Sequence, residues 1–401
     1  MNMRRYFNTE GLCDPWEHYM VSLDERLEQI KRLFIDRGKY FVINRGRQYG
    51  KTTTLRALAE YLKEDYIVLS LDFQQIGTDE FKDGAVFSYA FANVLIETLN
   101  NTEEEAKRGL ADFLQDFVGR NKAGTLRELF VQLSQMCRSA SKPVVLMIDE
   151  VDSAANNQVF LDFLALLRGY YLERRARPTF HSVILAGVYD IKNLKLKIRK
   201  EEEHQYNSPW NIAADFNIDM NFSENQIQGM LLEYEADNHT GMDAEAISNC
   251  IYEYTSGYPY LVSAICKLID ERIYGTEEFQ CLADAWTEKG IRLAVRNILD
   301  EQIPLFGSMM RQLSQYPELK QMLNALLFQG KRVTFNPDSQ VISLASMFVY
   351  IVNRGSSVQV ANRIFEMRLY NFFYRRKNLR MPYMTRPREA ETSLSLKEDW
   401  I

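Results

Sequence analysis

Four short apolar runs stand out in the first half of the chain, each followed by residues typical of turns or helix starts. They are Tyr40–Ile43, Tyr66–Phe73, Val144–Ile148 and Phe180–Gly187. Continuous rather than alternating hydrophobicity is typical of strands buried on both faces of a parallel sheet. The stretch between 85 and 137 is long enough for crossover helices on both faces. The pattern therefore predicts an α/β fold with a parallel sheet.

The second half of the chain has a helical period. Amphipathic helices are predicted at Glu224–Glu235, Ala244–Thr255 and Tyr260–Ile273, with further helix over Thr276–Gln302. From about residue 305, helices and short strands alternate: helices Glu318–Phe328, Val341–Val352 and Asn362–Tyr374, and strand Val358–Ala361. We therefore predict a core over 1–220, a small helical domain over 221–303, a winged-helix-like domain over 304–375 and a tail over 376–401. The polar stretch 195–221 is predicted to be a loop that leaves the core.

The first apolar run leads into a turn and then Gly50-Lys51-Thr52, which opens a predicted helix over Thr53–Leu62. This strand–loop–helix is typical of the phosphate-binding loop of nucleoside triphosphatases. Gly50 would let the backbone approach phosphate, and the free N–H groups and dipole of the helix start would attract it. Lys51 would reach the β- and γ-phosphates, and the Thr52 hydroxyl would bind Mg²⁺. The full motif has glycine where this chain has Arg45, which predicts a differently built turn.

An acidic pair, Asp149 and Glu150, follows the run Val144–Ile148. Ligands of open α/β sheets bind at the carboxyl edge of the strands, so both side chains are expected beside the phosphate-binding loop. Asp149 is predicted to hold Mg²⁺, and Glu150 to orient and deprotonate the attacking water. Lys51 and Glu150 are therefore the candidate catalytic residues. Acidic residues also favour helix starts for structural reasons alone, and that alternative stays open.

These motifs, with Tyr19-Met-Val21, Lys39–Asn44, Ile148–Asp152 and Ser256-Gly-Tyr-Pro-Tyr-Leu261, resemble the AAA-like ATPases of bacteria, near the archaeal-type and STAND branches of the P-loop NTPases. The resemblance covers roughly residues 5–370. It implies an ATP-binding core, a helical lid and a C-terminal winged helix. The nucleotide-binding positions that it implies are Arg47, Gln48, Gly50, Lys51, Thr52 and Thr53, with Tyr19 near adenine and Gly257 and Pro259 in the lid turn. Tyr19 could equally be a core residue, and the turn a plain helix break.

Two further features follow from the resemblance. Arg174, Arg175 and Arg177 lie where an oligomeric relative can place an arginine finger that reaches a neighbour's γ-phosphate. Basic residues at a helix C-terminus also stabilise the helix, which is the structural alternative. Relatives often have a polar sensor after the fourth strand, where this chain has Gly187-Val-Tyr-Asp190. Tyr189, Asp190 and Asn193 are the candidates.

Composition indicates which classes of binding partner are favoured. The net charge is −6, from 48 basic and 54 acidic residues, so no overall field attracts nucleic acid. The candidate recognition helix Ser339–Tyr350 has no Lys or Arg, which favours a partner-docking winged helix over a DNA reader. A basic stretch from Arg375 to Arg388 could bind an acidic partner or nucleic acid, or simply be solvated. The five cysteines lack CxxC spacing, and no apolar run resembles a signal peptide or membrane span. These features predict a cytoplasmic protein without a structural metal.

The sequence therefore predicts Mg²⁺-dependent ATP binding and hydrolysis, coupled to movement of the lid and winged helix against an unknown protein partner. A homo-oligomer would agree with the arginine-finger interpretation. Two alternatives remain: a nucleotide switch with little turnover, and a nucleic-acid-binding regulator that uses the winged helix.

Overall fold

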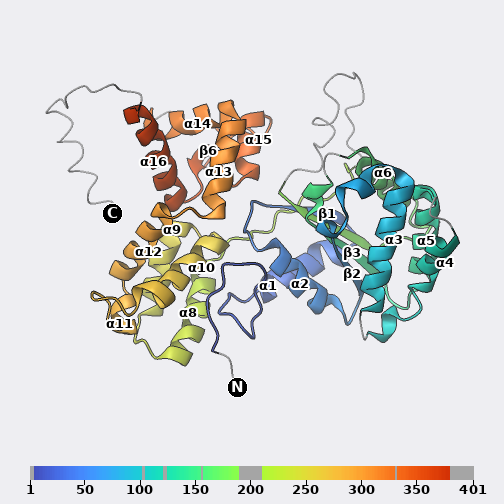
Figure 1. Cartoon of the computed structure of the whole chain (residues 1–401), viewed down its shortest axis with the longest axis horizontal. Coiled ribbons are helices and arrows are strands. Elements are labelled where there is room, and N and C mark those ends of the chain that lie inside the picture. The colour runs from blue at the N-terminus through green and yellow to red at the C-terminus, as the bar shows by residue number, and fades with distance from the viewer. Residues whose placement is uncertain are drawn as a thin grey trace. The chain divides into compact units, whose positions relative to one another are not determined.

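The computed structural model describes residues 4–101, 104–120, 124–154, 157–188, 210–329 and 332–379 (Figure 1). Their contacts form two compact units. One contains Leu23–Gly46 and Lys51–Asp219, and the other contains Met1–Ser22, Arg47–Gly50 and Met220–Ile401. We call the first the α/β unit and the second the helical unit. In the part of the chain described, no helix is long and apolar enough to cross a membrane.

The α/β unit is built on a four-stranded parallel sheet, which confirms the predicted fold class. Its strand order is β1 (Tyr40–Asn44), β4 (Ser182–Gly187), β3 (Val144–Asp149) and β2 (Ile67–Asp72). Every residue of β3 and β4 is buried, as their continuous hydrophobicity indicated. Beyond β1, the Ala214 N–H donates to the Tyr40 carbonyl at 2.8 Å, so the backbone near 214 covers the free edge of this strand.

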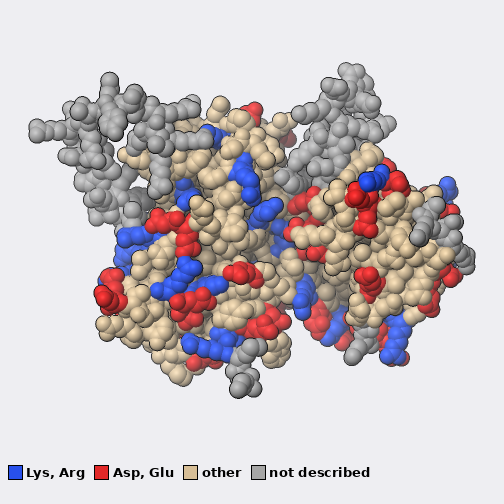
Figure 2. Space-filling view, in the orientation of Figure 1, with Lys and Arg blue, Asp and Glu red and all other residues tan. Residues whose placement is uncertain are grey.

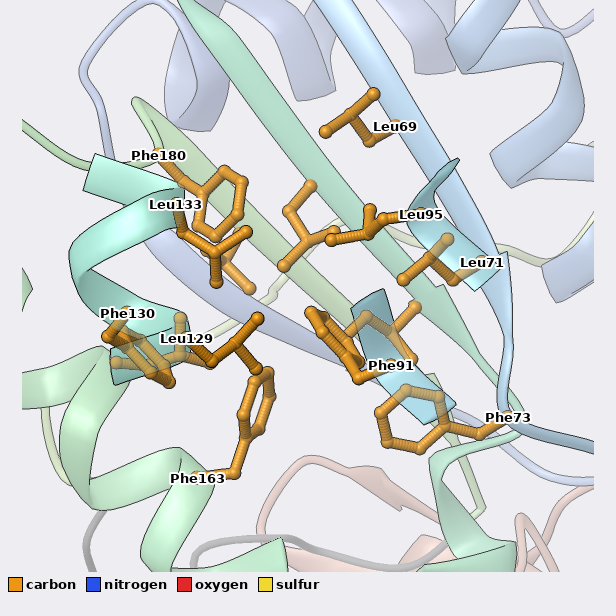
Figure 3. Packing of buried hydrophobic residues seen from close by; sticks show 14 of the residues in the cluster. Leu69, Leu71, Phe73, Phe91, Leu95, Leu129, Phe130, Leu133, Phe163 and Phe180 are labelled. Carbon is orange, nitrogen blue, oxygen red and sulfur yellow. The ribbon is translucent and has the colours of Figure 1, made fainter. Parts of the chain in front are cut away.

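Helices cover both faces of the sheet. They are α1 (Asp24–Ile30) with the π-helical turn η1 (Lys31–Ile35), α2 (Lys51–Leu62), α3 (Gly84–Asn100), α4 (Asp112–Arg120), α5 (Leu126–Ser139) and α6 (Gln158–Leu172). Short 3₁₀ turns stand at η2 (Phe73–Gln75), η3 (Thr78–Phe81), η4 (Glu105–Lys107) and η5 (Val151–Ser153). Alternate strand residues point into a core shared with α3 to α6, in which Leu71 lies on the side of Phe91 (Figure 3) and Phe91 packs against Phe163, 5.0 Å between ring centroids. On the other face, Phe34 of η1 packs against Phe41, with the ring centroids 4.6 Å apart and the rings tilted by 41°. This packing fixes the strand ends that carry the site.

The helical unit contains the second half of the chain. Its elements are α8 (Glu224–Asn238), α9 (Ala244–Thr255), α10 (Pro259–Leu268) with the π-helical turn η7 (Ile269–Ile273), α11 (Leu282–Ala285), α12 (Glu288–Asp300), α13 (Pro304–Gln315), α14 (Pro317–Phe328), α15 (Gln340–Met347), β5 (Ile351–Arg354), β6 (Ser357–Val360) and α16 (Arg363–Leu379). The predicted helix Val341–Val352 is wrong in its second half. Val349 has a positive φ of 58°, and Ile351 begins a strand that pairs antiparallel with β6. The winged-helix assignment stays a prediction.

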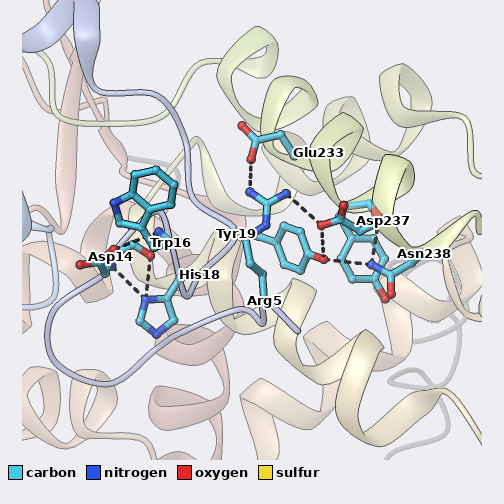
Figure 4. Close-up of polar contacts among 9 residues, drawn as sticks. Arg5, Asp14, Trp16, His18, Tyr19, Glu233, Asp237 and Asn238 are labelled. Atoms are coloured by element: carbon cyan, nitrogen blue, oxygen red, sulfur yellow. Dashed lines mark hydrogen bonds and ion pairs between the residues drawn. The ribbon is translucent and has the colours of Figure 1, made fainter. Parts of the chain in front are cut away.

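The N-terminal segment packs in the helical unit, whereas the predicted boundary at residue 220 kept it with the core. The Arg5 guanidinium donates to Glu233 at 2.7 Å and to Asp237 at 2.9 Å, both on α8 (Figure 4). The Tyr19 hydroxyl donates to the same Asp237 at 2.9 Å and accepts from Asn238 at 3.2 Å. These bonds attach both ends of the segment to one helix.

Candidate nucleotide-binding site

The loop between β1 and α2 has left-handed backbone at two positions, Gln48 with φ 56° and Gly50 with φ 71°. Left-handed backbone costs an ordinary L-residue roughly 1–2 kcal/mol, so glycine is favoured at position 50. No atom lies within 4 Å of where a Cβ on Gly50 would stand. The requirement for glycine here is therefore conformational, and the space beside the loop is open.

Lys51 begins α2 and turns its ammonium group back into the loop. Its Nζ donates to the Arg45 carbonyl at 3.1 Å and to the Gly46 carbonyl at 3.0 Å, and the residue is 7% exposed. A buried cation at a helix N-terminus sits where the helix dipole is also positive, so this end of α2 is strongly electropositive. Such a site is suited to an anion with several oxygen atoms.

The Thr52 hydroxyl donates to Asp149 Oδ2 at 2.6 Å, which joins the start of α2 to the end of β3. Asp149 is 7% exposed, and its other oxygen accepts from the Glu150 N–H at 2.9 Å. Hydroxyl and carboxylate oxygens are the ligands that Mg²⁺ prefers. The structure thus brings together the two predicted metal-binding residues, and their donor set fits Mg²⁺.

Glu150 stands next to this pair in a left-handed conformation, φ 52° and ψ 38°, and is half-buried. Burial raises the pKa of its carboxyl above the ordinary 4.5, while the Lys51 charge lowers it and Asp149, Asp152 and Asp72 raise it further. Non-glycine residues in this conformation are uncommon and often functional. A carboxylate with a raised pKa is a better proton acceptor, as a general base must be.

Arg45 explains why the loop lacks the usual first glycine. Its guanidinium donates to the carbonyls of Phe216 at 3.2 Å and Ile218 at 3.1 Å, and it lies 5.5 Å from the Phe216 ring. The side chain therefore holds the segment that covers the edge of β1. Sequence reasoning noticed the unusual residue but could not find its partners, because backbone carbonyls leave no mark in a sequence.

Asp152 is a second residue that sequence reasoning did not assign to the site. Its Oδ2 accepts from the Val188 N–H at 2.6 Å, just after β4. A Cβ on Gly187 would lie 2.8 Å from Asp152 Oδ1, so glycine leaves room for this carboxylate. Asp152 thus connects the acidic turn after β3 to the end of the neighbouring strand. The proposed sensor residues Tyr189, Asp190 and Asn193 lie outside the described residues.

The middle of the loop, Arg47–Gly50, belongs to the helical unit. The Tyr258 hydroxyl donates to the Arg47 carbonyl at 2.6 Å, and the Tyr49 ring packs edge-on against Tyr258 at 4.7 Å. Tyr258 stands between Gly257 and Pro259, the two residues assigned to the lid turn. It was not itself assigned a role, although its place in that turn was visible in the sequence.

The glycine and proline of that turn have backbone roles. Gly257 has φ 73°, and a Cβ there would lie 1.9 Å from the Phe222 carbonyl oxygen. Pro259 is the first residue of α10, where its missing N–H is not needed. Together they set the position of Tyr258, and their own contact with nucleotide stays a prediction. Of the other loop residues, Arg47 is exposed, while Gln48 and Thr53 are half-buried.

Tyr19 and the three arginines are not brought to Lys51 by the described contacts. Tyr19 is 2% exposed and packs among the aromatic rings of Phe7 and Tyr234, which gives it a structural role; its contact with adenine stays a prediction. Arg174 donates to the Gly38 carbonyl at 2.8 Å, at the sheet edge where β1 begins, opposite Asp149. Arg177 pairs with Glu173 at 3.2 Å, and Arg175 is exposed. An arginine finger acting on a neighbouring chain stays a prediction.

The geometry of the loop and its acidic partners agrees with a family assignment that covers most of the chain. The family model for the AAA-like domain matches residues 19–375. The chain belongs to this AAA-like family. It is therefore a P-loop ATPase, and the predicted family, fold class and enzyme class are confirmed.

Solved structures include two that this AAA-like protein resembles over nearly their full length. One is a Walker-type ATPase of Pyrococcus abyssi, at 12% identity and a TM-score of 0.59, covering 91% of this chain and 99% of that one. Another is the ORC2 protein of Aeropyrum pernix with ADPNP and ADP, at 13% identity and a TM-score of 0.49, covering 90% and 97%. At these identities the first likeness shows the fold alone. No curated protein matches the sequence.

Proposed function

We propose that this ATPase hydrolyses ATP with Mg²⁺ held by Thr52 and Asp149, and that its nucleotide state is transmitted to the helical unit through Tyr258. The observation that carries the first part is the 2.6 Å bond between the Thr52 hydroxyl and Asp149. This bond supports the proposal because it joins two side chains whose oxygens are suited to Mg²⁺. When bound, Mg²⁺ neutralises phosphate charge and polarises the phosphate oxygens.

Lys51 and Glu150 divide the remaining work. The Lys51 ammonium now donates to two carbonyls of its own loop, so it is held at the mouth of α2 with donors oriented into the loop. A bound triphosphate would compete with these two carbonyls for the ammonium group. Its oxygens are charged, and a charged acceptor forms a hydrogen bond roughly twice as strong as a neutral one. Glu150 can accept the proton of a water molecule, because burial raises its pKa while the nearby Lys51 charge keeps its carboxylate form accessible.

The second part rests on contacts of the loop within the helical unit. The Tyr258 hydroxyl holds the Arg47 carbonyl, and the Tyr258 ring packs edge-on against Phe365 of α16 at 5.3 Å. Phe365 in turn contacts Tyr350, just before β5, at 6.2 Å. A change in the conformation of Arg47 would therefore shift Tyr258 and, through the packed aromatic rings, Phe365 of α16. Such a contiguous network is the physical means by which two sites can be coupled.

A protein partner is favoured over nucleic acid. Helix α15 (Gln340–Met347), the expected recognition helix of a winged helix, contains no Lys or Arg. Figure 2 shows acidic and basic side chains intermixed on the visible faces, without a continuous basic field. A DNA-binding surface normally neutralises several phosphates with cations. We therefore expect added duplex DNA to leave ATP turnover unchanged; a salt-sensitive stimulation would favour the nucleic-acid alternative.

Phosphate release from Mg-ATP tests the assignment of the metal and the lysine. Lys51→Ala is expected to abolish nucleotide binding, and Thr52→Ala to retain weak binding while losing Mg²⁺-dependent turnover. Glu173→Gln, at an exposed acid beyond α6, is the matched control and should behave as the wild type. If the wild type retains tightly bound nucleotide but releases no phosphate, the protein is a nucleotide switch rather than a hydrolase. If Thr52→Ala hydrolyses ATP at the wild-type rate, the metal assignment is wrong.

A further inference from the structure

A cavity of about 570 Å³ lies within the helical unit, among α9, α12, α14 and α16. This volume is in the range of pockets that hold small molecules. Helix α12 turns Arg292, Val295, Arg296 and Leu299 toward it, and these residues share one face at helical spacing. Helix α16 contributes a face in the same way. The cavity is therefore a space between two helix faces, separate from the loop that binds nucleotide.

Three arginines line the cavity. The Arg363 guanidinium lies 4.8 Å from the centre of the Tyr254 ring. Arg292 lines the same cavity. Its charge and that of Arg363 both lower the pKa of the Tyr254 hydroxyl, against the larger upward effect of burial. Arg292 is paired with Glu288 at 3.2 Å, one turn earlier on α12. Arg296 follows one turn later, and the structure gives it no ion pair among the residues described. Three guanidinium groups thus line the cavity, and Arg292 and Arg296 are also exposed to solvent.

Apolar and acidic side chains complete the lining. Val295 is 2% exposed and Leu299 is 8% exposed, and Met367 of α16 lines the same space. Arg368 of α16 donates to the Leu299 carbonyl, so the two helices are in contact beside the cavity. Of the two lining carboxylates, Glu366 lies one turn beyond Arg363, and Asp300 lies one turn beyond Arg296. With three arginines and two carboxylates the lining has a net charge of +1, so it is suited to a ligand that carries a single negative charge.

We propose that this cavity binds a small amphiphilic monoanion, with its carboxylate, sulfonate or phosphate group at Arg296 and Arg363 and its apolar or aromatic body against Val295, Leu299 and Met367. Guanidinium groups form strong paired hydrogen bonds with such anions, and the apolar floor supplies the area that a small ligand must bury. The site is additional to the ATPase function. Arg363, which lines the cavity, lies two residues before Phe365 on α16. A bound ligand would therefore act close to the contact between Phe365 and Tyr258.

The aromatic sulfonate 8-anilinonaphthalene-1-sulfonate is a suitable probe, because its fluorescence rises when it enters an apolar site. The titration uses the full chain with excess ATP, which keeps the probe out of the nucleotide site. We expect saturable binding at one site. Arg296→Gln should weaken it about tenfold, the loss expected for one charged hydrogen bond of roughly 1.4 kcal/mol. Met367→Trp should abolish it by filling the cavity.

Two controls separate this site from general stickiness. Lys289→Gln removes a cation from the same helix, α12. Lys289 pairs with Glu278 and does not line the cavity, so binding should not change. N-phenyl-1-naphthylamine, which has the same rings without the sulfonate, should bind wild type and Arg296→Gln equally. Circular dichroism checks that each variant is folded. Equal binding of the sulfonate to wild type, Arg296→Gln and Met367→Trp, or binding that does not saturate, would overturn the proposal.

Discussion

Tyr258→Phe removes a single hydroxyl group, which bonds to the Arg47 carbonyl of the nucleotide-binding loop within the helical unit. The ring is retained, with its contacts to Tyr49 at 4.7 Å and Phe365 at 5.3 Å, so packing is expected to survive. The lost interaction is the 2.6 Å bond to the Arg47 carbonyl. A buried neutral hydrogen bond contributes about 1 kcal/mol net. The unfolding free energy should therefore fall by about 1 kcal/mol.

Loss of the same bond is also expected to weaken the affinity for ATP. If the hydroxyl holds the loop in the conformation that binds nucleotide, part of that energy is lost from binding as well. About 1 kcal/mol corresponds to a roughly fivefold weaker affinity. Isothermal titration with ATP in the presence of Mg²⁺, using the turnover-deficient Glu150→Gln background, measures the affinity directly. Urea unfolding measures the stability of the same variants.

Tyr260→Phe is the matched control, because Tyr260 lies two residues further along, in the first turn of α10, and its hydroxyl has no hydrogen bond among the residues that the structure describes. It should change neither quantity. A Tyr258→Phe variant that loses stability but binds ATP as tightly as its parent would refute the coupling and leave the residue a structural role. Unchanged stability and unchanged affinity would refute the hydrogen bond itself.

Three further predictions concern the α/β unit. Arg45→Met should lower the unfolding free energy by about 2 kcal/mol in urea titrations, because Phe216 and Ile218 lose a charged donor while the apolar stem is kept; an unchanged value would contradict the edge-holding role. Gly187→Ala should slow ATP turnover and cost about 1–3 kcal/mol of stability, since its Cβ would lie 2.8 Å from Asp152 Oδ1, whereas Gly169→Ala, with nothing within 4 Å, should be neutral or stabilising. Glu150→Gln should be more stable than the wild type at pH 8 and equal to it near pH 4. The reason is that folding raises the pKa of Glu150, so wild-type stability falls as the pH rises through that value. If the melting temperatures of the two proteins differ by the same amount at every pH between 4 and 8, this prediction is contradicted.

The sheet was predictable because its environment is simple. Strands β3 and β4 are buried on both faces, so their sequences are apolar without interruption. The run Phe348-Val-Tyr-Ile-Val352 has the same character, yet the predicted helix Val341–Val352 includes all of it. Apolar runs of this length suit either structure, and here pairing with β6 decides for a strand from Ile351.

The site was predictable only for residues whose own side chains belong to a recognisable motif. Thr52 and Asp149 are recognisable from their motifs, and the structure joins them. Arg45 and Tyr258 act on backbone carbonyls of Phe216, Ile218 and Arg47, and such acceptors are the same for every residue type. Their partners follow from the fold and could not be read from composition or spacing.

The most direct test of the central claim is a single-turnover measurement on ATP already bound to the protein. Wild type and Glu150→Gln are mixed with substoichiometric labelled ATP, Mg²⁺ is added, and ADP formation is followed by rapid quench. We expect both proteins to bind ATP, and the variant to cleave it at least about 100-fold more slowly, the usual contribution of a general base. Cleavage by Glu150→Gln at the wild-type rate would contradict the account, because the half-buried carboxylate beside Asp149 would then not be the base.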